Sequence, residues 1–316
     1  MFALNIFIYA ISFIAVWFGA GLIIAAVDKL SKKIRVSSFA LSFFVLGLLT
    51  SIPEFAVGLT AISENNPEIF AGNLIGGIVV IFLLIIPLLA IFGNGVKLNS
   101  QLNDKNLLFS FIVMLAPTFM VLDRKVSNWE GIVLIGLYAF LFYFIQKNKG
   151  VLDNGHAEVL HARSYSFIDI LKIILGIALV FVSSNLIVDR TIYFANAFNI
   201  SAFYISLIVL SLGTNIPEIS LGVRSVISGK KDVAFGDFVG SASANTLLFG
   251  LFTLLNSGEV ITASNFINTL LLLAFGLGLF YYFTRSKHDV SRKEGFILFG
   301  FYCFFVVVEL FGLIIL

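Results

Sequence analysis

The chain carries the sequence TSIPE at residues 50–54 and TNIPE at residues 214–218, each within a long apolar run. The second copy follows the first at an offset of 164 residues, and the same offset aligns Gly72 with Gly236 and Gly76 with Gly240. These matches indicate an internal duplication. Each copy places a proline and a glutamate inside an apolar segment. Such residues are costly in a bilayer, and they typically mark an ion site near the middle of the membrane.

The composition indicates that lipid surrounds this protein. Of its 316 residues, 59% are hydrophobic and 12% are charged, and the mean hydropathy is +1.04. A soluble domain of this length does not need so much apolar surface, so we expect a membrane protein. The net charge of +2 gives no reason to expect a nucleic-acid partner. The single cysteine, Cys303, excludes an intrachain disulfide and a cysteine-based metal site.

Polar clusters divide the chain into ten candidate membrane helices. Their approximate limits are 5–27, 36–63, 69–92, 107–122, 131–146, 167–189, 200–227, 233–255, 264–284 and 295–315. No basic segment precedes the first of them, so it is expected to be a retained span and not a cleaved signal peptide. Loops on one side of these helices carry fifteen Lys and Arg residues, and loops on the other side carry three. Because basic loops stay in the cytoplasm, we expect a multi-pass protein of the cell membrane with both termini extracytoplasmic.

The ten helices form two groups of five. Residues 1–146 make the first repeat, residues 147–166 a cytoplasmic linker, and residues 167–316 the second repeat. Because five is odd, the second repeat enters the membrane upside down relative to the first, as in many secondary transporters. The sequence therefore predicts an all-α membrane protein with ten transmembrane helices in two inverted five-helix repeats, with broken helices at the midplane. The linker is too short to be a folded domain.

The two prolines predict where the helices break. Proline has no amide hydrogen, so Pro53 frees the carbonyl of Leu49 and Pro217 frees that of Gly213. Inside lipid these carbonyls need a partner, and a dehydrated cation can be one. A single proline of this kind is more often a simple kink, but its repetition favours an ion site.

Polar side chains accompany each proline at helical spacing. They are Thr50, Ser51 and Glu54 in the first copy, and Thr214, Asn215 and Glu218 in the second. At spacings of three and four residues, these side chains share one face of a helix. An all-oxygen set of this kind suits a hard cation such as Ca2+, which takes about 6–8 oxygen ligands.

A second repeated element reads GNLIGG at residues 72–77 and GDFVGS at residues 236–241. Glycines four residues apart let two helices pack closely. The second copy also carries a polar stripe on one helix face, formed by Asp237, Ser241 and Asn245. The aligned residues of the first copy are Asn73, Gly77 and Ile81. The predicted site is therefore rich in oxygen in the second half and poor in the first.

The positions of Asp237 and Asn245 along their helix predict different roles. Asp237 lies about 12 Å nearer the cytoplasmic surface at 1.5 Å per residue. We therefore expect Asp237 to reach interfacial water and Asn245 to coordinate the ion.

These proline and glycine elements resemble the alpha repeats of the cation/Ca2+ exchanger superfamily, specifically its prokaryotic sodium/calcium exchanger branch. The family pattern is Thr-Ser-aliphatic-Pro-Glu followed by Gly-Asn-x-x-Gly-Ser-x-x-x-Asn/Asp, once in each half. The resemblance implies Na+-driven Ca2+ exchange by alternating access, with the first and sixth helices sliding across a core of eight. Ca2+ and Na+ would then be transported substrates, and no cofactor is expected.

The resemblance also implies a ligand set. Glu54 and Glu218 would be the central carboxylates. The full expected set is Glu54, Glu218, Thr50, Ser51, Thr214, Asn215, Ser241 and Asn245. The chain departs from the family pattern where Asn215 replaces a serine and Asp237 replaces an asparagine. Gly77 and Ile81 also replace a serine and an Asn/Asp, which removes two side-chain ligands and leaves the number of bound sodium ions open.

Two other functions stay open at this point. A Ca2+/H+ or other divalent-cation antiporter needs only a titrating carboxylate, but those branches usually carry an acid in the third-span element, and none follows Asn73. A membrane protein that kept the exchanger fold without transporting is favoured by Gly77 and Ile81. An enzyme is not expected, because no catalytic arrangement of His, Cys or Ser lies within a span.

Overall fold

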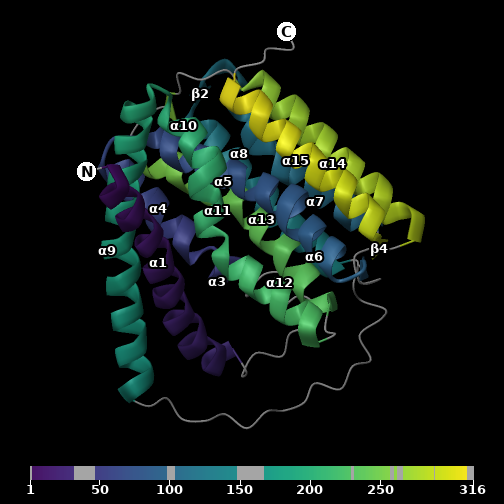
Figure 1. The fold of residues 1–316 in the computed structure, drawn as a ribbon, viewed down its shortest axis with the longest axis horizontal. Coiled ribbons are helices and arrows are strands. Elements are labelled where there is room, and N and C mark those ends of the chain that lie inside the picture. Colours follow the sequence, from purple (N-terminus) through teal and green to yellow (C-terminus); the bar gives the residue numbers. More distant parts are fainter. Residues whose placement is uncertain are drawn as a thin grey trace.

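The computed structural model describes residues 2–31, 47–97, 104–147, 167–228, 231–256, 260–261, 266–287 and 289–311, and most of them are helical (Figure 1). The first half contains α1 (Phe2–Ser31), α3 (Gly47–Thr50), α4 (Ile52–Ser63), α5 (Pro67–Val79), the π-helix η2 (Val80–Ile85), α6 (Ile86–Phe92), β1 (Val96–Lys97), α7 (Asp104–Met120), η3 (Val121–Asp123), β2 (Lys125–Val126) and α8 (Asn128–Lys147). The second half contains α9 (Phe167–Phe198), α10 (Ala202–Ile205), the π-helix η4 (Ser206–Leu210), α11 (Ser211–Thr214), α12 (Ile216–Ser228), α13 (Lys231–Leu255), β3 (Val260–Ile261), α14 (Ile267–Lys287), β4 (Asp289–Val290) and α15 (Arg292–Phe311).

Eight helical segments in the described part of the chain are long and apolar enough to cross a membrane. They are Phe2–Ile23, Pro67–Phe92, Lys105–Asp123, Asn128–Ile145, Ile170–Phe198, Phe235–Leu255, Ile267–Arg285 and Arg292–Phe311. A ninth span is formed if Ala202–Thr214 and Ile216–Val223, which meet at 42°, count together. The predicted span 36–63 is described only from residue 47 onward, and the predicted linker beyond residue 147 lies outside the described residues. The chain is a multi-pass membrane protein.

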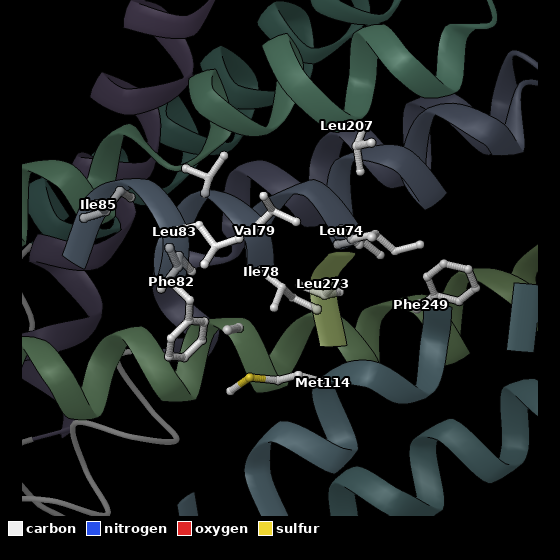
Figure 2. Packing of buried hydrophobic residues seen from close by; sticks show 14 of the residues in the cluster. Leu74, Ile78, Val79, Phe82, Leu83, Ile85, Met114, Leu207, Phe249 and Leu273 are labelled. Atoms are coloured by element: carbon white, nitrogen blue, oxygen red, sulfur yellow. The ribbon is translucent and has the colours of Figure 1, made fainter. Parts of the chain in front are cut away.

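Two helices at equivalent positions form the centre of the molecule. In residues 67–92, which run through α5, η2 and α6, 83% of the apolar stretch is buried inside the protein. The corresponding value for α13 is 78%. By contrast, α8 and α9 bury only 28% each, which is expected for helices that face lipid. Figure 2 shows Leu74, Ile78 and Phe82 from this central segment packed with Phe249 of α13 and Met114 of α7. The repeated segments therefore lie where protein, not lipid, surrounds them.

The first helices of the two halves, α1 and α9, pack side by side and antiparallel (Figure 1). Near one end, the rings of Phe2 and Phe198 lie 6.0 Å apart. Toward the other end, Gly19 and Gly176 bring the two backbones close together. The buried Tyr9 hydroxyl also lies 2.8 Å from the Thr191 hydroxyl. The helices that begin the two halves thus run in opposite directions.

Short strands join the halves in an exchanged pattern. β1 pairs with β4 so that Val96 faces Val290, and β2 pairs with β3 so that Val126 faces Val260. The 164-residue offset converts Val96 into Val260 and Val126 into Val290. The second strand pair is therefore the first one with the two halves exchanged. These two-residue strands were not expected from the sequence, where they fall in predicted loops.

Candidate cation site

Each of the two repeated proline segments contains a helix break, which lies two residues before the proline. Ser51 separates α3 from α4 with φ −80° and ψ 10°, and Asn215 separates α11 from α12 with φ −85° and ψ 14°. The Ser51 amide donates to the Gly47 carbonyl at 3.3 Å, and the Asn215 amide donates to the Ser211 carbonyl at 3.2 Å. Each proline then falls in the first turn of the next helix, where its missing amide hydrogen costs least. The predicted breaks are present in both copies.

The breaks place the two glutamates at equivalent positions. Glu54 lies in the first turn of α4 and Glu218 in the first turn of α12. The N-terminal end of a helix favours negative charge. Glu54 is 1% exposed and Glu218 is fully buried, and the two carboxyl groups interact electrostatically. Two buried carboxylates from separate halves therefore approach one another.

Side chains from both halves surround Glu218. The Ser241 hydroxyl donates to Glu218 Oε1 at 2.7 Å. The Ser51 hydroxyl lies 3.4 Å from that of Ser241 and donates to the Gly47 carbonyl at 2.8 Å. Thr50 is a further neighbour of the Glu218 carboxyl group. Four of the eight predicted ligands thus form one contiguous cluster.

The surroundings of Glu54 repeat this arrangement in part. Thr214 neighbours the Glu54 carboxyl group, as its counterpart Thr50 neighbours Glu218. The Thr214 hydroxyl also donates to Asn73 Oδ1 at 3.0 Å. The counterpart of Ser241 in this half is Gly77, so Glu54 lacks the serine that Glu218 has. Glu218 thus has a serine donor whose first-half counterpart is a glycine.

Two asparagines of the second half fill the space beside Gly77. A Cβ atom added to Gly77 would lie 2.7 Å from Asn245 Nδ2 and 3.2 Å from Asn215 Nδ2. Asn245 donates to the Leu74 carbonyl at 2.9 Å, and Asn215 donates to the Ser211 carbonyl at 2.7 Å. Ile81, the other position without a ligand, is fully buried in the apolar core. The amides occupy the place that a serine at position 77 would take.

Several buried oxygens of this region have no hydrogen-bond partner among the described residues. They are Glu54 Oε2, Glu218 Oε2, Asn215 Oδ1, Asn245 Oδ1, and both Oδ atoms of Asp237. Buried polar atoms without a hydrogen-bond partner are costly. A group of such acceptors in one region therefore indicates a missing binding partner. A hard cation satisfies several such acceptors at once.

Carboxylates alone do not make this site. Within the described part of the chain, no three His, Cys, Asp or Glu side chains stand close enough together to hold one metal ion. Any ion held by Glu54 and Glu218 must therefore draw its remaining ligands from hydroxyl, amide or carbonyl oxygens. Thr50 neighbours Glu218, Thr214 neighbours Glu54, and the Ser51 hydroxyl contacts that of Ser241.

Asp237 differs from its prediction. We expected it to reach interfacial water, but it is 1% exposed. Its carboxyl group neighbours Thr50 and Glu218. The prediction was wrong because depth was counted along one helix, whereas α3 and α12, which carry Thr50 and Glu218, pack against α13. The sequence signal that relates these positions is the 164-residue offset, which pairs Asp237 with Asn73 and Thr50 with Thr214.

These features define a multi-pass membrane protein with a buried carboxylate site shared between two equivalent halves. A family model described as sodium/calcium exchanger protein matches residues 4–146 and 168–311. The chain belongs to this family, and the resemblance inferred from the sequence is confirmed.

Individual relatives span most or nearly all of the chain. The sodium/calcium exchanger MaX1 of Methanosarcina acetivorans is 23% identical over 98% of this chain and 99% of its own. The inner membrane protein YrbG of Escherichia coli is 24% identical over 79% of both. Among solved structures, the sodium-calcium exchanger NCX_Mj has a TM-score of 0.66 at 21% identity, covering 96% of this chain and 98% of that one. The H+/Ca2+ exchanger CAX has a TM-score of 0.75 at 16% identity, covering 98% and 86%.

Proposed function

We propose that this protein is a secondary active antiporter of the cell membrane that exchanges Ca2+ for Na+ by alternating access. Its family is one of cation exchangers. The observation that carries the proposal is the pair of buried glutamates, one at each helix break, each with an unpaired oxygen. Two carboxylates balance the charge of one divalent ion. The neighbouring hydroxyl and amide groups of Thr50, Ser51, Thr214, Asn215, Ser241 and Asn245 complete the proposed ligand set.

The proposal includes two inverted repeats, residues 1–146 and 167–316, of five transmembrane helices each. Three observations support this arrangement: the antiparallel α1 and α9, the exchanged strand pairs, and the matching contacts of Thr50 and Thr214. An inverted pair of repeats offers similar surfaces to the two sides of the membrane, which suits alternating access. With the basic loops in the cytoplasm, both termini lie outside.

The coupling ion has two candidates. Sodium fits the oxygen ligands that the chain keeps around Glu218, and the relative MaX1 carries the name sodium/calcium exchanger. Protons are the alternative, because Gly77 and Ile81 provide no ligand oxygen and a carboxylate alone suffices for a proton. The relative that bears on this alternative, the H+/Ca2+ exchanger CAX, shares the fold at low identity and does not decide the ion.

Flux measurements with purified protein in liposomes test the proposal directly. We expect an outward sodium gradient to drive calcium uptake at clamped membrane potential, while an outward proton gradient alone drives little. Glu218→Gln liposomes serve as the matched control and should take up no calcium above background. Uptake driven only by the proton gradient would replace sodium with protons, and no uptake under either gradient would favour a protein that does not transport.

A serine at position 77 tests the imbalance between the halves. We expect Gly77→Ser to bind sodium about tenfold more tightly than Gly77→Ala, because a hydrogen bond or ligand contact with a charged group contributes roughly 1.5–3 kcal/mol. Both variants place the same Cβ atom against the Asn245 amide, so the alanine variant is the control for the added hydroxyl. Calorimetric titration with sodium measures it. Adding Ile81→Asn should also steepen the sodium dependence of exchange. Equal affinities in the Ser and Ala variants would contradict this account.

A further inference from the structure

Asp237 is a third buried carboxylate that the proposed exchange of one divalent ion does not use. It is 1% exposed, and neither of its carboxylate oxygens has a hydrogen-bond partner among the described residues. Its neighbours are Thr50, from the other half of the chain, and Glu218. A buried carboxylate without partners is among the most costly groups a protein can hold. In its ionised form it requires a positive charge beside it.

The equivalent position in the first half shows that a structural role does not need an acid. Asn73 accepts a hydrogen bond from Thr214 at 3.0 Å, which is the counterpart of the contact between Asp237 and Thr50. An amide oxygen therefore serves as the acceptor in that half without any charge. If Asp237 served only as a polar neighbour of Thr50, an asparagine would do the same at a lower cost of burial.

Charge and position together identify the class of ion. Glu54 and Glu218 already balance a divalent cation, so a third carboxylate leaves one negative charge to be matched. No three acidic, His or Cys side chains of the described residues can hold a single ion together. An ionised Asp237 would therefore need a separate ion, for which a single positive charge suffices.

We propose that Asp237 forms a sodium subsite beside the Glu54 and Glu218 pair, with Thr50 and Glu218 supplying further oxygen ligands. The choice of sodium as the ion rests on the proposed function. The test, which counts bound sodium ions, does not depend on transport. It gives the second half a charged ligand that the first half lacks. It also offsets the ligands missing at Gly77 and Ile81.

Counting bound sodium ions tests the subsite. Purified full-length protein in detergent, free of divalent cations, is titrated with radioactive sodium at equilibrium. We expect Asp237→Asn and Asp237→Ser each to bind one sodium ion fewer than wild type, or to bind that ion at least about tenfold more weakly. Sodium should also raise the unfolding temperature of wild type more than that of either variant. Calcium binding, measured by calorimetry, should remain detectable in both.

Two further variants serve as controls. Glu309→Gln neutralises a buried carboxylate of α15 that is already bonded to the Thr269 hydroxyl at 2.8 Å, and the number of bound sodium ions should not change. The exchange Asn73→Asp with Asp237→Asn moves the acid to the equivalent position beside Thr214, and it should restore the lost ion. An unchanged sodium count in both Asp237 variants would overturn the subsite. A wild-type protein that binds no calcium would instead overturn the proposed function.

Discussion

Glu218→Gln is expected to reduce divalent-cation affinity by at least about a hundredfold. Removing one partner of a buried charge pair costs roughly 3–5 kcal/mol, and about 1.4 kcal/mol corresponds to a factor of ten in affinity. Glutamine keeps the size of the side chain and can still accept from Ser241, which donates to Glu218 at 2.7 Å. The loss therefore reports the charge and not the packing. Calorimetric titration with calcium measures it.

Glu54→Gln should lose affinity to a similar extent, because the two carboxyl groups occupy equivalent turns and interact with each other. Glu309→Gln is the matched control, since it neutralises another buried carboxylate outside this region. The control should bind calcium with wild-type affinity. Wild-type affinity in either the Glu54 or the Glu218 variant would refute a shared central site.

The local chemistry of proline explains why the helix breaks could be predicted. The missing amide hydrogen of Pro53 and Pro217 acts on the residues immediately before them, whatever the fold. The burial of the eight candidate ligands could also be predicted, because apolar sequence surrounds each of the polar segments that contain them. None of the eight is more than 2% exposed.

Packing between the halves could not be predicted in the same way. The carboxyl group of Asp237 is buried beside residues of α3 and α12, and the sequence of α13 alone does not contain that information. The two amides beside Gly77 come from α13 and from the break at Asn215, which are far apart in the chain. The 164-residue offset held part of the answer, since it pairs Asp237 with Asn73 and Thr50 with Thr214.

The π-helices are a second feature that the sequence did not predict. η4 leads directly into α11 and the break at Asn215, and η2 follows α5. A π-turn widens a helix locally, and such turns are frequent at functional sites. The apolar residues of these segments fit an α-helical pattern equally well. Their position next to the repeated elements is thus a property of the folded protein.

The role of Asn245 as a ligand stays a prediction. Its amide nitrogen is bonded to the Leu74 carbonyl, while its Oδ1 has no partner among the described residues. That arrangement leaves the oxygen available to an ion. The depth argument that set Asn245 against Asp237 no longer holds, because both side chains are buried.

The glycine at position 76 is expected to be essential for the approach of the two halves. A Cβ atom on Gly76 would lie 2.1 Å from the Leu207 carbonyl oxygen and 2.7 Å from the Ser211 hydroxyl. The nearer obstacle is backbone, so a rotamer change cannot relieve it, and α5 must move away from η4 and α11. The same movement would lengthen the 3.0 Å hydrogen bond from Thr214 to Asn73.

We therefore expect Gly76→Ala to lower stability by about 1–3 kcal/mol, the usual cost of overpacking, and to weaken calcium binding as well. Thermal unfolding in detergent and calorimetry measure the two effects. Gly136→Ala in α8 is the matched control, because no atom lies within 4 Å of its added Cβ. Alanine is the better helix former by roughly 0.5–1 kcal/mol, so this control should be neutral or slightly stabilising. If Gly76→Ala unfolds and binds calcium as Gly136→Ala does, close contact at Gly76 is not what holds the two halves of the site together.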